Sequence, residues 1–179
     1  IKQEEDTEKG YTQTINILKD SLRKPEGKKM MSYVLNFGLS YPDKPYGRKP
    51  IMSITMNDVC VANPVNCEQY ESGEVLLNKE ERLVEIVNEE LEANRNCFIF
   101  CSYTGDPESN VTERLKSIIE TRCHLKGRVQ IIQASSPQAV EREECMHQKA
   151  AEGMQVFICN PKVVETGLDF CFKHLDEVY

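Results

Sequence analysis

The chain has 179 residues, of which 40% are hydrophobic, and a formal net charge of −7, with a pI of about 5.1. This length suits one α/β domain of about 150 residues or slightly more, and no apolar run approaches the roughly 18 residues of a membrane span. The acidic balance argues against a large sequence-independent nucleic-acid footprint, but it allows a local basic strip because net charge averages over all faces.

The two ends and the cysteines indicate whether the protein is secreted and whether its thiols are reduced. Residues 1–6 lack the basic patch and the apolar core of a secretory signal, and both ends suggest a fragment of a longer protein. The eight cysteines include no CxxC pair, so we expect reduced, buried thiols in a cytoplasmic protein. Cys97 and Cys101 should share the inward face of one strand. Cys60 and Cys67 are the one pair worth testing for a bridge or a metal, but no nearby histidine completes a four-ligand set, so no metal site is expected.

The first 78 residues are predicted to form a helical and irregular extension. Residues 1–10 are highly charged and are expected to fray. Apolar residues at helical spacing predict amphipathic helices over about 11–24 and about 28–40. Residues 41–50 contain three prolines and a glycine, which predicts an ordered loop. Residues 51–77 are expected to be irregular, with short edge strands as an option.

From residue 79 to residue 179 strands and helices alternate. The predicted strands cover residues 97–102, 129–133 and 154–159. The predicted helices cover residues 79–94 with Asn78 as cap, a segment that begins at Asp106-Pro107 and ends near His124, and a segment from Ser136-Pro137 to about Ala151. The alternation predicts an α/β fold with a mainly parallel sheet and helices on both faces. Right-handed crossovers then bring the carboxyl ends of the strands, with their loops, to one edge of the sheet.

Polar side chains follow each predicted strand, and they are the candidate binding residues. These residues are Ser102, Tyr103 and Thr104 after the first strand, Ser135 after the second, and Asn160, Lys162, Thr166, Gly167 and Asp169 after the third. Hydroxyls and free backbone N–H groups at strand ends suit phosphate oxygens, and a lysine meets phosphate as a point charge. Taken singly, each loop is also explained by turns and caps. No Ser/His/Asp or Cys/His set is found, so no catalytic residue is assigned.

Three motifs in this order resemble a known family. They are Phe98-Ile-Phe-Cys-Ser-Tyr-Thr104, then Gln133-Ala-Ser-Ser136 with Arg142-Glu143-Glu144, and finally Asn160-Pro-Lys-Val-Val-Glu-Thr-Gly-Leu-Asp169. They resemble the second RecA-like lobe of superfamily 2 helicases. The spacing from Asn160 to Gly-Leu-Asp is most similar to the Swi/Snf-type branch. The match covers about residues 79–179.

The resemblance implies the C-terminal lobe of an ATP-dependent helicase or translocase, with a three-layer RecA-like fold. It implies that Ser102, Tyr103, Thr104, Ser135, Asn160 and Lys162 contact nucleic acid, with DNA favoured over RNA. Thr166, Gly167 and Asp169 would lie towards ATP. ATP and its Mg²⁺ would be bound mainly by a first RecA-like lobe of the same longer chain.

The chain also departs from the family pattern. Val164 and Glu165 replace two glycines, and no GxxxxGK[ST] phosphate loop or arginine-rich closing motif occurs in these 179 residues. The chain alone is therefore expected to have no ATPase activity. The alternatives are a non-catalytic α/β module that binds a nucleotide or a partner, and a transferase domain, for which no acidic metal-binding pair is found at a strand end.

Overall fold

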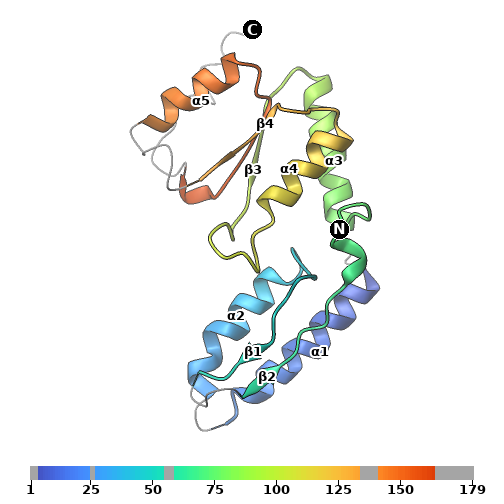
Figure 1. The fold of residues 1–179 in the computed structure, drawn as a ribbon, viewed down its shortest axis with the longest axis vertical. Helices are drawn as coiled ribbons and strands as arrows, with labels where there is room; N and C mark the ends of the chain where they lie inside the picture. Colours follow the sequence, from blue (N-terminus) through green and yellow to red (C-terminus); the bar gives the residue numbers. More distant parts are fainter. Residues whose placement is uncertain (1–3, 25–26, 55–58, 134–140, 164–179) are drawn as a thin grey trace. The chain divides into compact units, whose positions relative to one another are not determined.

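The computed structural model describes residues 4–24, 27–54, 59–133 and 141–163, which form two compact units (Figure 1). Unit 1 contains residues 1–81 and 105–110, and unit 2 contains residues 82–104 and 111–179. The proposed division of the chain at residue 78 stays a prediction. Among the described helices, none has the length and apolarity that crossing a bilayer requires.

Unit 1 contains mainly helices and one small hairpin. Its elements are α1 Glu5–Ser21, η1 Gly27–Met30, α2 Met31–Ser40, β1 Ile51–Met52, β2 Cys60–Ala62 and η2 Glu68–Tyr70. Strands β1 and β2 pair antiparallel. The second predicted helix, the loop over 41–50 and the short strands agree with this arrangement. The expectation that residues 5–10 fray is wrong, because α1 begins at Glu5 with acidic side chains in its first turn, where they stabilise the helix dipole.

The core of unit 1 is built around Tyr41. Its side chain is fully buried, and it packs with residues of α1, α2 and β2, namely Ile15, Leu18, Val34, Phe37 and Ala62. The Tyr41 hydroxyl donates a hydrogen bond to the backbone oxygen of Val65 at 2.8 Å. Burial raises the pKa of this phenol, so the hydroxyl keeps its proton and its role as a donor.

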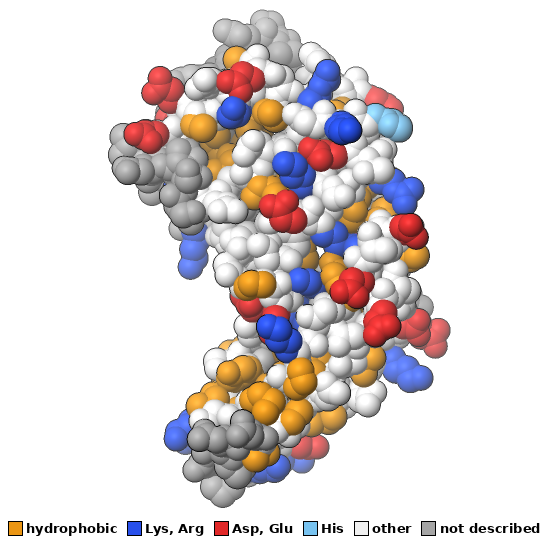
Figure 2. Space-filling view, viewed as in Figure 1, with side chains coloured by type: hydrophobic (Ala, Val, Ile, Leu, Met, Phe, Trp, Pro, Cys, Tyr) orange, Lys and Arg blue, Asp and Glu red, His pale blue; other side chains and the backbone are white. Residues whose placement is uncertain are grey.

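Unit 1 also exposes apolar side chains on one helix. Met31, Leu35 and Leu39 are 46%, 56% and 64% exposed, and their spacing of four places them along one side of α2. Figure 2 shows hydrophobic side chains gathered on the visible face of this unit. Val34 and Phe37 of the same helix are buried, so α2 is apolar on more than its core-facing side.

Unit 2 is built on a parallel sheet, as the alternating pattern predicts. Its described elements are α3 Asn78–Glu92, which begins at the end of unit 1, β3 Cys97–Phe100, α4 Thr112–Arg122, β4 Val129–Ile132, α5 Arg142–Ala151, β5 Val156–Cys159 and η4 Pro161–Val163. The strand order is β3-β5-β4 and both pairings are parallel. Phe100, Cys159 and Ile132 stand level at the carboxyl ends. The chain therefore has a mixed α/β fold.

Helices cover both faces of this sheet. On one face, Val87 of α3 and Leu115 and Ile119 of α4 pack with Cys97, Ile99, Cys101, Val129, Val156 and Ile158. On the other face, Met146 of α5 packs with Ile132, Phe157, Cys159 and Val163. Burial of Cys97 and Cys101 on the same side confirms that they share the inward face.

In unit 2, the starts of α3 and α4 differ from expectation. Helix α3 begins at Asn78 itself, not after it. The N–H of Leu77, just before the helix, donates to the carboxylate of Glu80 at 2.9 Å, which is one of the two hydrogen bonds of a capping box. Helix α4 begins at Thr112, not at Asp106-Pro107. Asp106 instead closes a single turn by accepting hydrogen bonds from the backbone of Ser109 and Asn110. Val111 has ψ near 1° and φ of −115°, so the turn does not continue into the helix.

Gly10 and Gly38 provide a matched pair of substitutions in unit 1. A Cβ at Gly10 would lie 2.4 Å from the Tyr41 hydroxyl and 3.2 Å from the Val65 Cβ, whereas a Cβ at Gly38 would meet only ordinary contacts at 3.6 Å or more. We expect Gly10→Ala to lower the free energy of unfolding by about 1–3 kcal/mol through overpacking. Gly38→Ala should raise it by up to about 1 kcal/mol through helix propensity. Urea unfolding followed by circular dichroism measures both, and equal shifts would contradict the close contact at Gly10.

Candidate nucleic-acid interface

The carboxyl edge of the sheet in unit 2 is formed by the loops that follow β3, β4 and β5. Because the three strands are parallel and in register, these loops begin at the same level. The described parts of the edge are residues 101–104, residue 133 and residues 160–163, and we call this region the carboxyl edge. The expectation that strand ends meet at one edge is therefore confirmed for the described strands.

Asn160 joins two loops of the carboxyl edge. Its side-chain nitrogen Nδ2 donates to the backbone oxygen of Ser102 at 2.8 Å, and its Oδ1 accepts from the backbone N–H of Lys162 at 3.0 Å. A backbone bond from Cys101 to Cys159, 2.9 Å long, continues the pairing of β3 and β5 up to this point. The Asn160 amide therefore holds the loops together, and one of its two N–H donors is still available for a ligand.

The other side chains of this edge present hydroxyls and one cation. Ser102 and Lys162 are exposed, whereas Tyr103 and Thr104 are half-buried. Lys162 lies in η4, which is anchored because Val163 is 2% exposed and its N–H donates to the backbone oxygen of Asn160 at 2.9 Å. The loop therefore presents the lysine from a fixed backbone. Ser135, Thr166, Gly167 and Asp169 lie outside the described residues.

Arg142 is a positioning residue to which the sequence analysis assigned no role. The residue is 9% exposed, and its guanidinium donates from Nη1 to the backbone oxygen of Val163 at 3.1 Å, which ties the start of α5 to η4. The sequence signal was present, because Arg142 opens the Arg-Glu-Glu run of the second motif, but a charged residue at a helix start is ordinarily exposed. Its burial depends on the tertiary contact with η4.

The described residues of the carboxyl edge offer hydrogen-bond donors and one cation to an anion, and they form no metal site. No group of three or more His, Cys, Asp or Glu side chains is arranged to hold a metal ion within the described ranges. The described cysteines are free thiols, including Cys60, which is exposed, and Cys67, which is buried. Cys60 and Cys67, the pair singled out for testing, therefore form no disulfide bridge in this structure.

Breaking the link at Asn160 should release the η4 loop. We expect Asn160→Ala to lower the free energy of unfolding by about 0.5–1.5 kcal/mol, because two hydrogen bonds at a half-exposed position are lost. Asn160→Asp keeps an acceptor for the Lys162 N–H but loses the donor to Ser102. Amide hydrogen exchange should therefore show faster exchange at Lys162 in the alanine variant than in the aspartate variant. Equal exchange rates in wild type and Asn160→Ala would contradict the role of Asn160.

The buried thiols of Cys97 and Cys123 in unit 2 make the free energy of unfolding depend on alkaline pH. Burial, with a smaller contribution from Glu90, raises the pKa of Cys97 above its ordinary value of 9.0, and burial raises that of Cys123. Above about pH 9 the unfolded chain releases these protons while the folded chain retains them, so the free energy of unfolding falls as pH rises. Cys97→Ala should make this decline less steep between about pH 8 and about pH 10. Cys60→Ala removes an exposed thiol and is the control; an equal effect of both variants would contradict the prediction.

Comparison with known proteins adds no relative. No protein-family model, no curated protein and no solved structure matches the chain. The function is therefore inferred from the three sequence motifs and from the geometry of the carboxyl edge.

Proposed function

We propose that this chain is part of the C-terminal RecA-like lobe of an ATP-dependent helicase or translocase and that its carboxyl edge contacts a nucleic-acid backbone. The observation that carries the proposal is the Asn160 bridge, which places the loops after β3 and β5 side by side with Ser102 and Lys162 exposed. Both loops belong to motifs that resemble superfamily 2 helicases. The parallel sheet with helices on both faces is the framework that such a lobe requires.

In this proposal each group at the edge has a simple task. The Lys162 ammonium pairs with a phosphate, the Ser102 hydroxyl donates to a neighbouring phosphate oxygen, and Asn160 keeps the two loops in place. Such contacts position a strand without reading its sequence. Hydrolysis of ATP with Mg²⁺, bound mainly by a first lobe, supplies the free energy for movement. Thr166, Gly167 and Asp169 are assigned to the ATP side by the resemblance alone.

The net charge of −7 lowers the expected affinity for nucleic acid. One exposed lysine at the edge releases few counterions, so the affinity of this chain alone for a single strand should be low and should fall with salt by a shallow slope. DNA is favoured over RNA as the partner. A cleft with a first lobe would add further contacts.

A second candidate function is a non-catalytic α/β module that binds a nucleotide or a partner. The hydrogen bonds that Asn160 and Asp106 make within the protein favour this alternative. Asn160 uses both ends of its amide within the protein, and Asp106 uses its carboxylate to accept from the N–H of Glu108 at 3.1 Å. In this alternative the polar loops serve the fold, and neither ATPase activity nor its stimulation by DNA is expected.

Activity of a longer protein that includes the first lobe distinguishes the two candidates. We expect ATPase activity that single-stranded DNA stimulates, and none from the 179-residue chain alone. Lys162→Ala should raise the DNA concentration for half-maximal stimulation by about tenfold, the size of one charge-assisted contact.

The matched control is Lys126→Ala, which removes an equally charged, exposed side chain just before β4, at the opposite edge of the sheet. It should leave stimulation unchanged. ATPase activity that is indifferent to DNA and RNA, or equal losses in both lysine variants, would overturn the proposed function.

A further inference from the structure

Phe100 is the last residue of β3, and its side chain is 54% exposed. The two residues on either side of it, Ile99 and Cys101, are 9% and 7% exposed and face the core. A single exposed apolar residue is ordinary on a protein surface. Phe100 differs because other aromatic rings and the polar groups of the carboxyl edge lie next to it.

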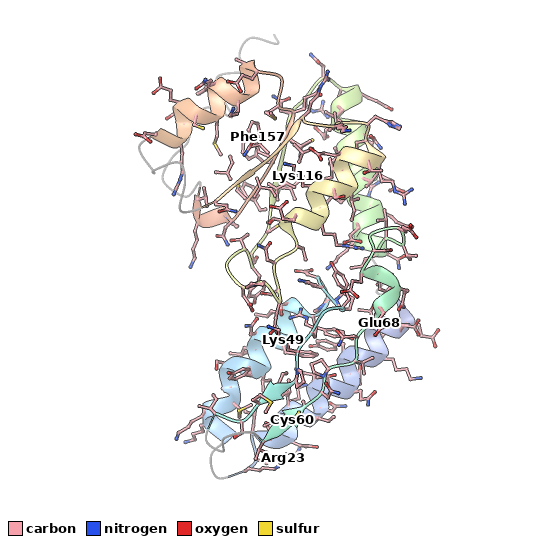
Figure 3. The ribbon with its side chains drawn as sticks, viewed as in Figure 1. Arg23, Lys49, Cys60, Glu68, Lys116 and Phe157 are labelled. Carbon is pink, nitrogen blue, oxygen red and sulfur yellow. The ribbon has the colours of Figure 1, made fainter. Side chains whose placement is uncertain are left out.

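The Phe100 ring ends a row of aromatic side chains on one face of the sheet. The rings of Phe100 and Phe98 are stacked with centroids 6.3 Å apart, and those of Phe98 and Phe157 with centroids 5.2 Å apart and an interplanar angle of 16°. Phe157 is 1% exposed and lies within the sheet (Figure 3). The exposed ring is therefore supported from the core outwards, and holding it in place for a ligand costs little side-chain entropy.

Beside the ring lie the polar groups of the carboxyl edge. Phe100 is paired in register with Cys159, the residue before Asn160. Phe98 packs against the cluster that contains Phe157, Cys159 and Val163, so η4 lies on the sheet face to which Phe98 and Phe100 point, since alternate residues of a strand share a face. The backbone of Lys162 therefore lies on the side of the sheet that carries the exposed ring.

Charge alone would hold an anionic strand weakly here. The first turn of α5, on the same face, contains Glu143 and Glu144, which oppose phosphate, while Lys162 attracts it. Stacking on an aromatic ring does not depend on these charges, because every base has a face that can stack on the ring. Single-strand binding sites combine such rings with a cation that follows the backbone.

We propose that Phe100 is a stacking platform for one base of a single-stranded nucleic acid, whose neighbouring phosphates lie against Lys162 and Ser102. This inference rests on the proposed function and deepens it, because it identifies a single strand with intact bases as the ligand of the carboxyl edge. The ring binds the base face and reads no sequence.

The chain contains no tryptophan, so Phe100→Trp creates a unique fluorescent reporter at the platform. Titration with an oligothymidylate of about 15 nucleotides should quench its emission, and an abasic oligonucleotide of equal length should not. Tyr33→Trp, on α2 and 41% exposed at the native residue, is the matched single-tryptophan control and should stay unquenched. Saturation is followed separately by the anisotropy of a dye-labelled oligothymidylate. If the emission of Phe100→Trp is unchanged at saturation, the platform is overturned.

Affinity gives the second measurement. Phe100→Ala should weaken binding of the oligothymidylate by about fivefold or more and leave binding of the abasic strand unchanged, whereas Phe100→Tyr should bind like the native chain. The tyrosine and tryptophan variants keep a ring, so they decide the question even where the alanine variant fails to fold.

The two proposals fail in different ways. A native chain that binds neither oligonucleotide, at low salt, contradicts the proposed function. A native chain that binds both oligonucleotides equally, or whose affinity is unaffected by Phe100→Ala, contradicts the platform alone. Emission of Phe100→Trp that is already blue-shifted in the free chain and insensitive to DNA would mean that protein, such as a second copy, covers the ring, and it also overturns the platform.

Discussion

The parallel pairing of β5 with two neighbours is the constraint on which unit 2 depends. Its four residues are at most 1% exposed, and their backbone groups bond β3 on one side and β4 on the other. A strand buried on both faces and paired on both sides cannot slip by one residue without turning Ile158 and Phe157 to the wrong helices. The register of β5 therefore determines which loops stand next to one another where the strands end.

The carboxyl edge follows from that register. Cys159 stands level with Phe100, so the next residue, Asn160, is within reach of the loop after β3. Arg142 then anchors η4 from the start of α5. Two hydrogen-bonding side chains from separate elements thus hold a short loop whose exposed residue is a lysine. A rigid framework that carries a few exposed polar groups is the usual arrangement of a binding site.

The sequence was informative where one local signal was strong. The apolar runs at 97–102, 129–133 and 154–159 predicted the strands, and their alternation with helices predicted parallel pairing. The start of α4 was mispredicted because Asp106 and Pro107 form the same cap-like turn whether or not a helix follows. The exposure of Phe100 could not be predicted, because an unbroken apolar run has no period that marks one residue as outward. The roles of Asn160 and Arg142 depend on long-range contacts, which local patterns do not contain.

The segment from Gly105 to Asn110 has a consequence for dissecting the protein. It belongs to unit 1 although it lies between two stretches of unit 2, and within unit 1 the Lys44 ammonium donates to the Pro107 oxygen at 2.6 Å while Lys49 pairs with Glu108 at 3.7 Å. A protein truncated to residues 79–179 would keep this segment but lack Lys44 and Lys49, which contact it. Residues 44 and 49 of unit 1 thus contact a loop whose sequence lies between two stretches of unit 2.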